Sequence, residues 1–192
     1  MVVMDIDITF HGPFRVGTGT PHLGVAETVD PDDLLPPSSL KGVMRASAEL
    51  LLPTRPDLVA EVFGASGGQH RAAPWHWGPV AFTIDPVVVH RARIAIDPVT
   101  NTAREGGLFL SDEVWCPSAS FSLLPIRPLD ADARRRHQIV LACAAAGVHN
   151  LGGDRRRGLG WVSLRPRDGA IDDALLEEFE ALRAARPGGT HA

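Results

Sequence analysis

The 192-residue chain contains no tyrosine, a single lysine and only two cysteines. Cys116 and Cys143 lie far apart and match neither the spacing of a metal site nor that of a disulfide framework. No apolar run is long enough to span a bilayer, and Asp5 and Asp7 interrupt the N-terminal stretch where a signal peptide would be apolar. We therefore expect a cytoplasmic protein that has no membrane partner.

Composition and charge are those of a globular protein. Hydrophobic residues make up 44% of the chain, which is enough for a packed core. We expect one domain over residues 1–186 and a disordered tail at 187–192. The formal net charge of −4 disfavours a protein that binds nucleic acid on its own. Runs of arginine at 134–136 and 155–157 nevertheless permit a local basic surface on an acidic whole.

Hydrophobic periodicity predicts the order strand, helix, strands, helix, strand. Residues 2–10 alternate between two faces, one of them apolar throughout, as in a half-buried strand. Further strands are expected at 80–84, 89–97, 108–114, 118–126 and 161–164, and helices at 40–52, 56–63, 131–147 and 171–185. Between them we expect a long ordered loop at 14–37 and a mobile connection at 64–77. This order indicates an α+β fold, with a ferredoxin-like or RRM-like βαββαβ core, inserted loops and an extra hairpin.

Two segments carry residues suited to phosphate. The first, residues 36–45, reads PPSSLKGVMR, and we expect Ser38 or Ser39 to cap a helix there. A helix N-terminus presents free backbone N–H groups, and the two hydroxyls add donors. Lys41 and Arg45 lie one turn apart on one face of that helix. The alternative is an ordinary capped helix with two solvated cations.

The second segment, residues 152–160, reads GGDRRRGLG and is called the glycine loop below. Its glycines permit positive φ and a close approach of the backbone to a ligand. Its three adjacent arginines offer paired donors to phosphates. The residue order does not match a nucleotide-binding P-loop. The alternative is a basic surface hairpin that has no ligand.

These two segments do not stand alone. Together with RIAIDPVTNTAREGGLF at 93–109 and HGPFRVGTG at 11–19, they resemble, in content and order, the hallmark segments of the repeat-associated mysterious protein (RAMP) superfamily. The resemblance covers residues 6–162 and is to backbone-type subunits of type III CRISPR effector complexes. It implies an RRM-like fold and a role in antiviral defence, with CRISPR RNA, complementary target RNA and other effector subunits as partners. It also implies repeated copies of the chain along the RNA, as a filament.

The resemblance further implies catalysis. In backbone subunits of this family, an aspartate in the loop before the helix cleaves target RNA in a metal-dependent reaction. Asp30 matches that position and would bind Mg²⁺ or Mn²⁺, with Asp32 and Asp33 as alternatives because this loop is short. Cleavage by the RNA's own 2′-hydroxyl needs loss of a proton and neutralisation of phosphate charge, which a carboxylate-bound divalent ion assists. The alternative is that these acids are ordinary turn residues beside a proline.

In the family, an insertion such as residues 97–106 contacts the RNA duplex, here through Arg93 and Arg104. The predicted RNA-binding residues are therefore Ser38, Ser39, Lys41, Arg45, Arg93, Arg104, Gly152, Gly153, Arg155, Arg156 and Arg157. Trp75 and Trp77 either stack on bases or form a hydrophobic cluster.

Three alternatives to a cleaving backbone subunit stay open. The chain could be a structural or capping subunit that binds RNA without cutting it. It could process CRISPR RNA with a histidine, for which His11, His22, His90 and His149 are candidates that show no second catalytic group in the sequence. It could also be an RRM-like binding module unrelated to CRISPR, although the shared segments would then coincide by accident.

Overall fold

The computed structural model describes residues 3–22, 24–65, 71–169 and 171–185. Its strands are β1 (Met4–Phe10), β2 (Val25–Glu27), β3 (Trp75–Trp77), β4 (Ala81–Phe82), β5 (Val87–Ile96), β6 (Ala103–Trp115), β7 (Ser118–Pro125) and β8 (Val162–Pro166). Its helices are α1 (Pro37–Leu51), α2 (Pro56–Phe63), α3 (Ala131–Ala146) and α4 (Asp173–Ala184), and a 3₁₀ turn, η1, spans Arg155–Arg157. The predicted tail at 187–192, and residues 66–70 of the predicted mobile connection, lie outside the described residues.

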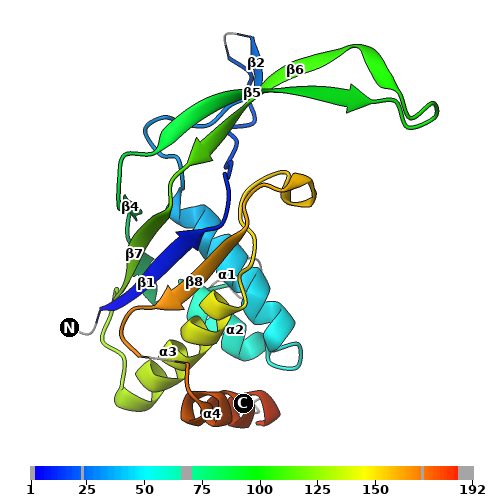
Figure 1. Ribbon diagram of the computed structural model, residues 1–192. Coiled ribbons are helices and arrows are strands. Elements are labelled where there is room, and N and C mark those ends of the chain that lie inside the picture. The colour runs from blue at the N-terminus through cyan, green and yellow to red at the C-terminus, as the bar shows by residue number, and fades with distance from the viewer. Residues whose placement is uncertain (1–2, 23, 66–70, 170, 186–192) are drawn as a thin grey trace.

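The central sheet has the strand order β3–β7–β1–β8, with antiparallel pairings, and β4 also pairs with β7. In chain order the core is β1, α1, β3, β7, α3 and β8, which is the predicted βαββαβ arrangement (Figure 1). The alternation in β1 holds, because Ile6 and Ile8 are fully buried while Thr9 is exposed. The RRM-like prediction is confirmed.

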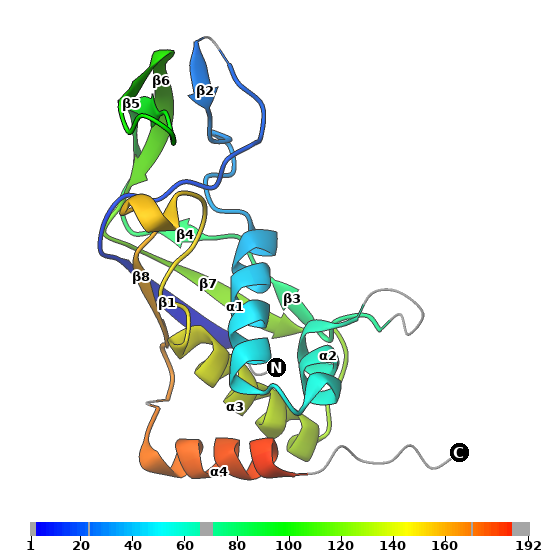
Figure 2. The same cartoon turned by 90° about the vertical axis from the view of Figure 1, so that its right-hand side faces the viewer.

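Helices α1 and α3 pack side by side against one face of this sheet, and α4 lies against α3 (Figure 2). Leu40 and Met44 of α1 and Leu141 of α3 are fully buried there, and Phe179 anchors α4. Burying one such side chain stabilises the fold by about 1.5–3 kcal/mol, and these residues form one hydrophobic core with the buried face of the sheet. Among the described residues, no helix combines the length and apolarity of a membrane span.

β5 and β6 form a long hairpin, called the arm below, that projects away from the helical layer (Figure 1). β2 pairs in parallel with the other edge of β6, so the loop expected at 14–37 contains a short strand. The apolar positions of β5 do share one face, but that face is open. Ile94 and Ile96 are 53% and 58% exposed, and Leu108, opposite Ile94, is 70% exposed. The arm therefore has no core of its own on this side.

The expected serine cap of α1 is wrong. Pro36 occupies the N-cap position, Pro37 is the first helical residue, and no side chain caps the helix. Proline suits the first helical position because it lacks an N–H group and its φ is already helical. Ser38 and Ser39 therefore lie within the first turn, and the helix begins three residues earlier than predicted.

The connection expected to be mobile at 64–77 ends in the strand β3. Trp75 and Trp77 are only 2% and 8% exposed. Trp77 stacks on Phe121 with ring centres 5.9 Å apart, and Nε1 of Trp75 donates to Nδ1 of His137 at 3.1 Å. The two indoles belong to the hydrophobic core, so the hydrophobic alternative is confirmed and these rings are not free to stack on bases.

Candidate nucleic-acid interface

The glycine loop packs on the turn that follows β1. A side-chain carbon on Gly152 would lie 2.1 Å from the carbonyl oxygen of Arg15, and one on Gly160 would lie 1.9 Å from that of Leu151. Both glycines also have φ near +74°. The backbone N–H of Gly153 donates to the same Arg15 oxygen at 2.8 Å. Contacts within the protein therefore account for these glycines, and we do not assign Gly152 or Gly153 to RNA.

A network of ion pairs lies beneath the loop. Asp154, in the left-handed region at φ +52°, accepts from Arg15 at 2.7 Å and from Arg93 at 2.9 Å through the same oxygen. Arg15 also pairs with Glu27, and Arg93 with the buried Glu113 at 2.9 Å. Paired charges of this kind need one another, because an unpaired buried charge is costly. The network fixes the loop to β2 and to the arm.

Arg93, a predicted RNA contact, is thus part of the protein's own structure. Its side chain is 12% exposed and held by two carboxylates. Sequence reasoning missed its partners because Asp154 and Arg93 are far apart in the chain. The neighbouring Arg91 lies on the same face of β5, is 60% exposed and lies 3.3 Å from Glu113. The alternation of Arg91 and Arg93 was the available signal for this face.

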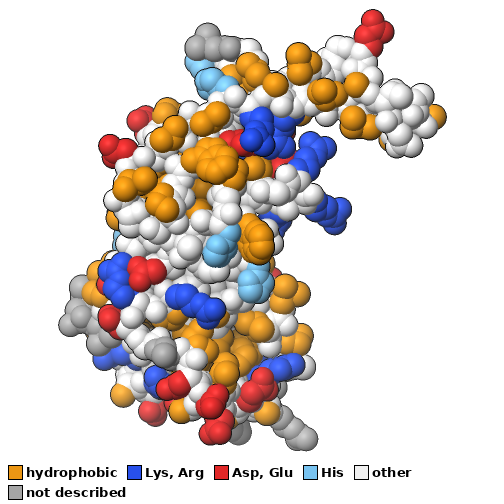
Figure 3. Space-filling view, viewed as in Figure 1, with side chains coloured by type: hydrophobic (Ala, Val, Ile, Leu, Met, Phe, Trp, Pro, Cys, Tyr) orange, Lys and Arg blue, Asp and Glu red, His pale blue; other side chains and the backbone are white. Residues whose placement is uncertain are grey.

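Three guanidinium groups remain on the outside of the glycine loop. Arg155, Arg156 and Arg157 are exposed on η1, and only the last approaches Asp154, at 4.0 Å, among the described residues. A cleft of about 340 Å³ separates the loop from the arm. It is lined by Pro13, Arg91, Arg93, Glu113, Trp115, Arg157, Gly158 and Leu159. Figure 3 shows basic side chains gathered around this junction. The arrangement suits a chain of phosphates.

The start of α1 contributes less than its sequence indicates. Arg45 pairs with Glu49 one turn later at 2.8 Å and donates to the carbonyl of Gly64 at 3.3 Å. Lys41 is half-buried, and the described residues include no ion-pair partner for it. Ser38 is exposed and its backbone N–H has no backbone acceptor among the described residues. Ser38, Ser39 and Lys41 therefore remain able to meet a phosphate.

Asp30 lies on an exposed turn between β2 and α1. Its Oδ1 accepts from the backbone N–H of Asp32 at 3.0 Å, and its carbonyl accepts from Asp33 at 3.2 Å. This is the local turn role expected of an aspartate beside proline. The backbone N–H of Val29, just before it, donates to the buried carboxylate of Asp112 at 3.1 Å. This hydrogen bond fixes the turn to β6, while the side chains of Asp30, Asp32 and Asp33 stay exposed.

The donor set of this loop fits a divalent ion only in part. Within the described ranges, no three or more His, Cys, Asp or Glu side chains gather as a metal site. One carboxylate with water and phosphate oxygens is a usual way to hold Mg²⁺. Asp30 fits that arrangement only if RNA supplies the other oxygens.

The open face of the central sheet is a poor RNA platform. RRM-type proteins stack bases on aromatic residues of this face. Here the described positions include Asp5 and Asp7 of β1, which face Ser122 and Ser120 of β7. Arg167 pairs with Asp7 at 2.5 Å and lies 3.6 Å from Asp5. Acids and serines favour water over stacked bases, so the glycine loop and the arm form the better candidate surface.

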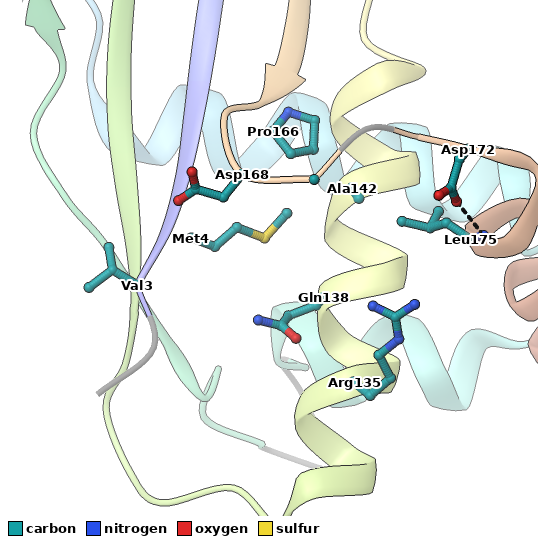
Figure 4. A pocket seen from close by; sticks show the side chains of 10 residues that line it. Val3, Met4, Arg135, Gln138, Ala142, Pro166, Asp168, Asp172 and Leu175 are labelled. Carbon is teal, nitrogen blue, oxygen red and sulfur yellow. Dashed lines mark hydrogen bonds between the residues drawn. The ribbon is translucent and has the colours of Figure 1, made fainter.

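A second cleft, of about 420 Å³, opens at the other end of the molecule (Figure 4). It lies between the start of β1, the end of β8 and helices α3 and α4. Arg135 and Asp172 line it on the helical side, and Met4 and Asp168 lie across from them. Asp172 caps α4, accepting from the N–H of Leu175 at 2.9 Å, and Arg135 pairs with Glu178 at 2.5 Å. These charged groups are engaged in holding α4, so the cleft offers no free site of its own.

Comparison with known proteins identifies the family. The family model of the RAMP superfamily matches residues 7–163. No curated protein matches the chain in sequence. Among solved structures, the chain is similar to one chain of the type III-B Cmr-beta complex in its apo state. The TM-score is 0.69 at 13% identity, over 86% of this chain and 97% of that one. A chain of type III-B Cmr-beta bound to cognate target RNA gives a TM-score of 0.65 at 13% identity with the same coverage. The structural likeness concerns the fold, and the family match, which spans most of the sequence, shows that this chain belongs to the RAMP superfamily.

Proposed function

We propose that the chain is a CRISPR RNA-binding subunit of a type III effector complex that acts in the cytoplasm in antiviral defence. The observation that carries the proposal is the glycine loop. It presents three exposed arginines, and the ion pairs of Asp154 with Arg15 and Arg93 hold it in place. The family match supports it. The similar structures are described as type III-B Cmr-beta, one of them bound to cognate target RNA. Other effector subunits and target RNA are the further partners that follow.

The loop binds the RNA backbone rather than its bases. Guanidinium groups on phosphates set position and affinity but carry no sequence information, which suits a subunit that must accept any guide. Arg91 across the cleft, Lys41 and Ser38 at α1, and Arg104 on the arm extend the contact. The net charge of −4 makes one copy a weak binder, whereas repeated copies would form a continuous basic groove with added avidity.

Co-purification from the native host tests this proposal. A tagged chain is isolated, treated with nuclease, and the protected RNA is sequenced. We expect short RNAs that carry CRISPR spacer sequence, together with other effector subunits. Recovery without RNA, or with RNA of unrelated sequence, would show that the chain has another role.

Cleavage of target RNA by the loop at Asp30 is the second part of the proposal. The observation that favours it is an exposed carboxylate on a turn fixed by the buried Asp112. Mg²⁺ or Mn²⁺, when bound with RNA oxygens, would supply positive charge to the phosphate that is attacked. The chain itself holds the turn in place and presents the Asp30 carboxylate. A complex that binds target RNA with these ions but never cuts it would favour the structural or capping subunit instead.

A further inference from the structure

His90 of β5 and Asp112 of β6 face each other across the arm. The Nδ1 atom of His90 lies 2.6 Å from Oδ1 of Asp112. The imidazole side chain is 61% exposed, whereas the carboxylate is 8% exposed. A buried carboxylate that accepts from Nδ1 keeps the ring proton on that nitrogen, which leaves a free lone pair on Nε2. The pair thus presents an oriented base to solvent.

The same carboxylate also fixes the loop that carries Asp30. Its second oxygen, Oδ2, accepts from the backbone N–H of Val29 at 3.1 Å. Val29 is buried and directly precedes the exposed Asp30. Figure 1 shows β2, which leads into this loop, beside β6 of the arm, and β5 pairs with the other edge of β6. One buried carboxylate therefore sets the positions of both the imidazole and the Asp30 turn.

The other described histidines lack this arrangement. Nε2 of His11 lies 2.7 Å from the hydroxyl of Ser163, and the ring tilts against Trp161. His137 pairs with Glu61 but is buried. Among the described residues, His90 is the exposed histidine whose ring bonds to a carboxylate. Position and chemistry single it out from the four histidines that the sequence leaves equivalent.

We propose that His90 is the general base for RNA cleavage at the Asp30 loop, with Asp112 as its positioning residue, an inference that rests on the proposed cleavage. Nε2 of His90 takes the proton of the RNA 2′-hydroxyl. The 2′-oxygen forms a bond to the adjacent phosphorus while the bond from phosphorus to the 5′-oxygen breaks. The leaving 5′-oxygen takes a proton from water, and His90 returns its proton to solvent. The products are a 2′,3′-cyclic phosphate and a 5′-hydroxyl end.

Single-turnover cleavage by the assembled, guide-loaded complex provides the test. The probe is a labelled complementary RNA with Mg²⁺ present, measured over a range of pH. His90→Ala should slow cleavage by about 100-fold or more, the usual contribution of a general base, while guide and target binding stay unchanged. Added imidazole should restore part of the rate. A general base cannot act once it carries a proton, so a fall in rate at acidic pH that arises from this base should disappear in the variant. Asp112→Asn should also slow cleavage, and His76→Gln, an exposed histidine on β3, is the matched control.

The outcomes separate this inference from the proposal beneath it. A wild-type rate in His90→Ala overturns the general-base role and leaves cleavage at Asp30 standing. A slower rate that imidazole does not restore, with the acidic limb unchanged, also overturns it, because His90 would then only support the loop. A wild-type complex that never cuts overturns both the inference and the proposed cleavage.

Discussion

Arg15 and Asp154 are 139 residues apart in the chain and form an ion pair of 2.7 Å. The same carboxylate oxygen accepts from Arg93 on the arm at 2.9 Å. One aspartate thereby joins the turn after β1, the arm and the glycine loop. These ion pairs hold the glycine loop in place, so the three exposed arginines that follow Asp154 have a fixed position. The proposed RNA binding depends on that position.

Asp154→Asn should weaken both the fold and RNA binding. Asparagine keeps the shape but removes the charge that balances two partly buried arginines, and breaking such a pair costs about 3 kcal/mol. The unfolding free energy, measured by denaturant titration, should fall by about 2–4 kcal/mol. Asp85→Asn, at an exposed position, is the control and should stay within about 0.5 kcal/mol of wild type. Equal midpoints for all three proteins would show that the network contributes nothing.

Two glycines of the loop give a matched comparison. Gly158 and Gly160 both have positive φ, at +83° and +74°. A side-chain carbon on Gly158 meets open space, whereas one on Gly160 would overlap the carbonyl oxygen of Leu151 at 1.9 Å. Gly158→Ala should lower the unfolding free energy by about 1–2 kcal/mol, the cost of the left-handed backbone alone. Gly160→Ala should cost clearly more, by at least about 2 kcal/mol beyond that, because the backbone must move. Equal losses of unfolding free energy in the two variants would contradict a clash between a side chain at position 160 and the carbonyl of Leu151.

The acids of the loop before α1 are tested one at a time. Asp30→Asn keeps the shape of the turn and loses the charge, so target cleavage should stop while guide binding is retained. Folding should change by no more than about 0.5 kcal/mol, because the side chain is exposed. Asp32→Asn and Asp33→Asn are the matched controls and should cut normally. If one of these two abolishes cleavage instead, that residue takes the role, and normal cutting by all three variants would exclude this loop.

Local patterns were enough to predict much of the fold. The alternation in residues 2–10 predicted β1, because its inward positions all enter one core. Hydrophobic periodicity over residues 40–52 predicted most of α1, and the short helix predicted at 56–63 matches α2 in full. These features depend on neighbours in sequence. The serine cap was wrong because two hydroxyl residues were given more weight than Pro37, whose own preference for the first helical position decided the start.

The site depended on contacts that local patterns do not contain. Arg93 carries the same charge as Arg91 one position along the face, yet only the fold places Asp154 against it. Four histidines looked equivalent until cross-strand register put Asp112 opposite His90. Apolar alternation in β5 correctly indicated a shared face but not its exposure, because exposure depends on what packs there.

The buried pair of His137 and Glu61 predicts a pH dependence of stability. Burial lowers the pKa of His137 below its ordinary 6.5, and the hydrogen bond that His137 donates to Glu61 offsets this only in part. The bond from Trp75 to Nδ1 requires that nitrogen to be unprotonated, and Nε2–H then donates to Glu61 at 2.9 Å. Burial alone would raise the pKa of Glu61, but its bond to His137 and the charges of His137 and Arg136 lower it.

The sign follows from proton uptake. Below pH 6.5 the unfolded chain binds a proton at His137 that the folded chain resists, so the unfolding free energy falls as pH drops below 6.5. A further fall begins below 4.5, where the unfolded Glu61 takes up a proton first. Denaturant titration at pH of about 7 and about 5.5 checks the first step. His137→Leu should lose that contribution and be less stable by about 1–3 kcal/mol, because Trp75 and Glu61 lose their partner. The idea fails if wild type is equally stable at both pH values.

The salt dependence of RNA binding tests the central claim most directly. The full-length chain is titrated with a labelled single-stranded RNA at several salt concentrations between about 50 and 200 mM. Each phosphate contact contributes about 0.7 to the slope of log affinity against log salt for single strands, so replacing Arg155, Arg156 and Arg157 with alanine should reduce the slope by about 2. Affinity for unrelated RNA sequences should fall alike. Replacing the exposed Arg127, Arg165 and Arg183 removes the same charge elsewhere and should leave the slope near that of wild type. An unchanged slope in the glycine-loop variant would contradict the account, because the three arginines would then make no contact with RNA phosphates.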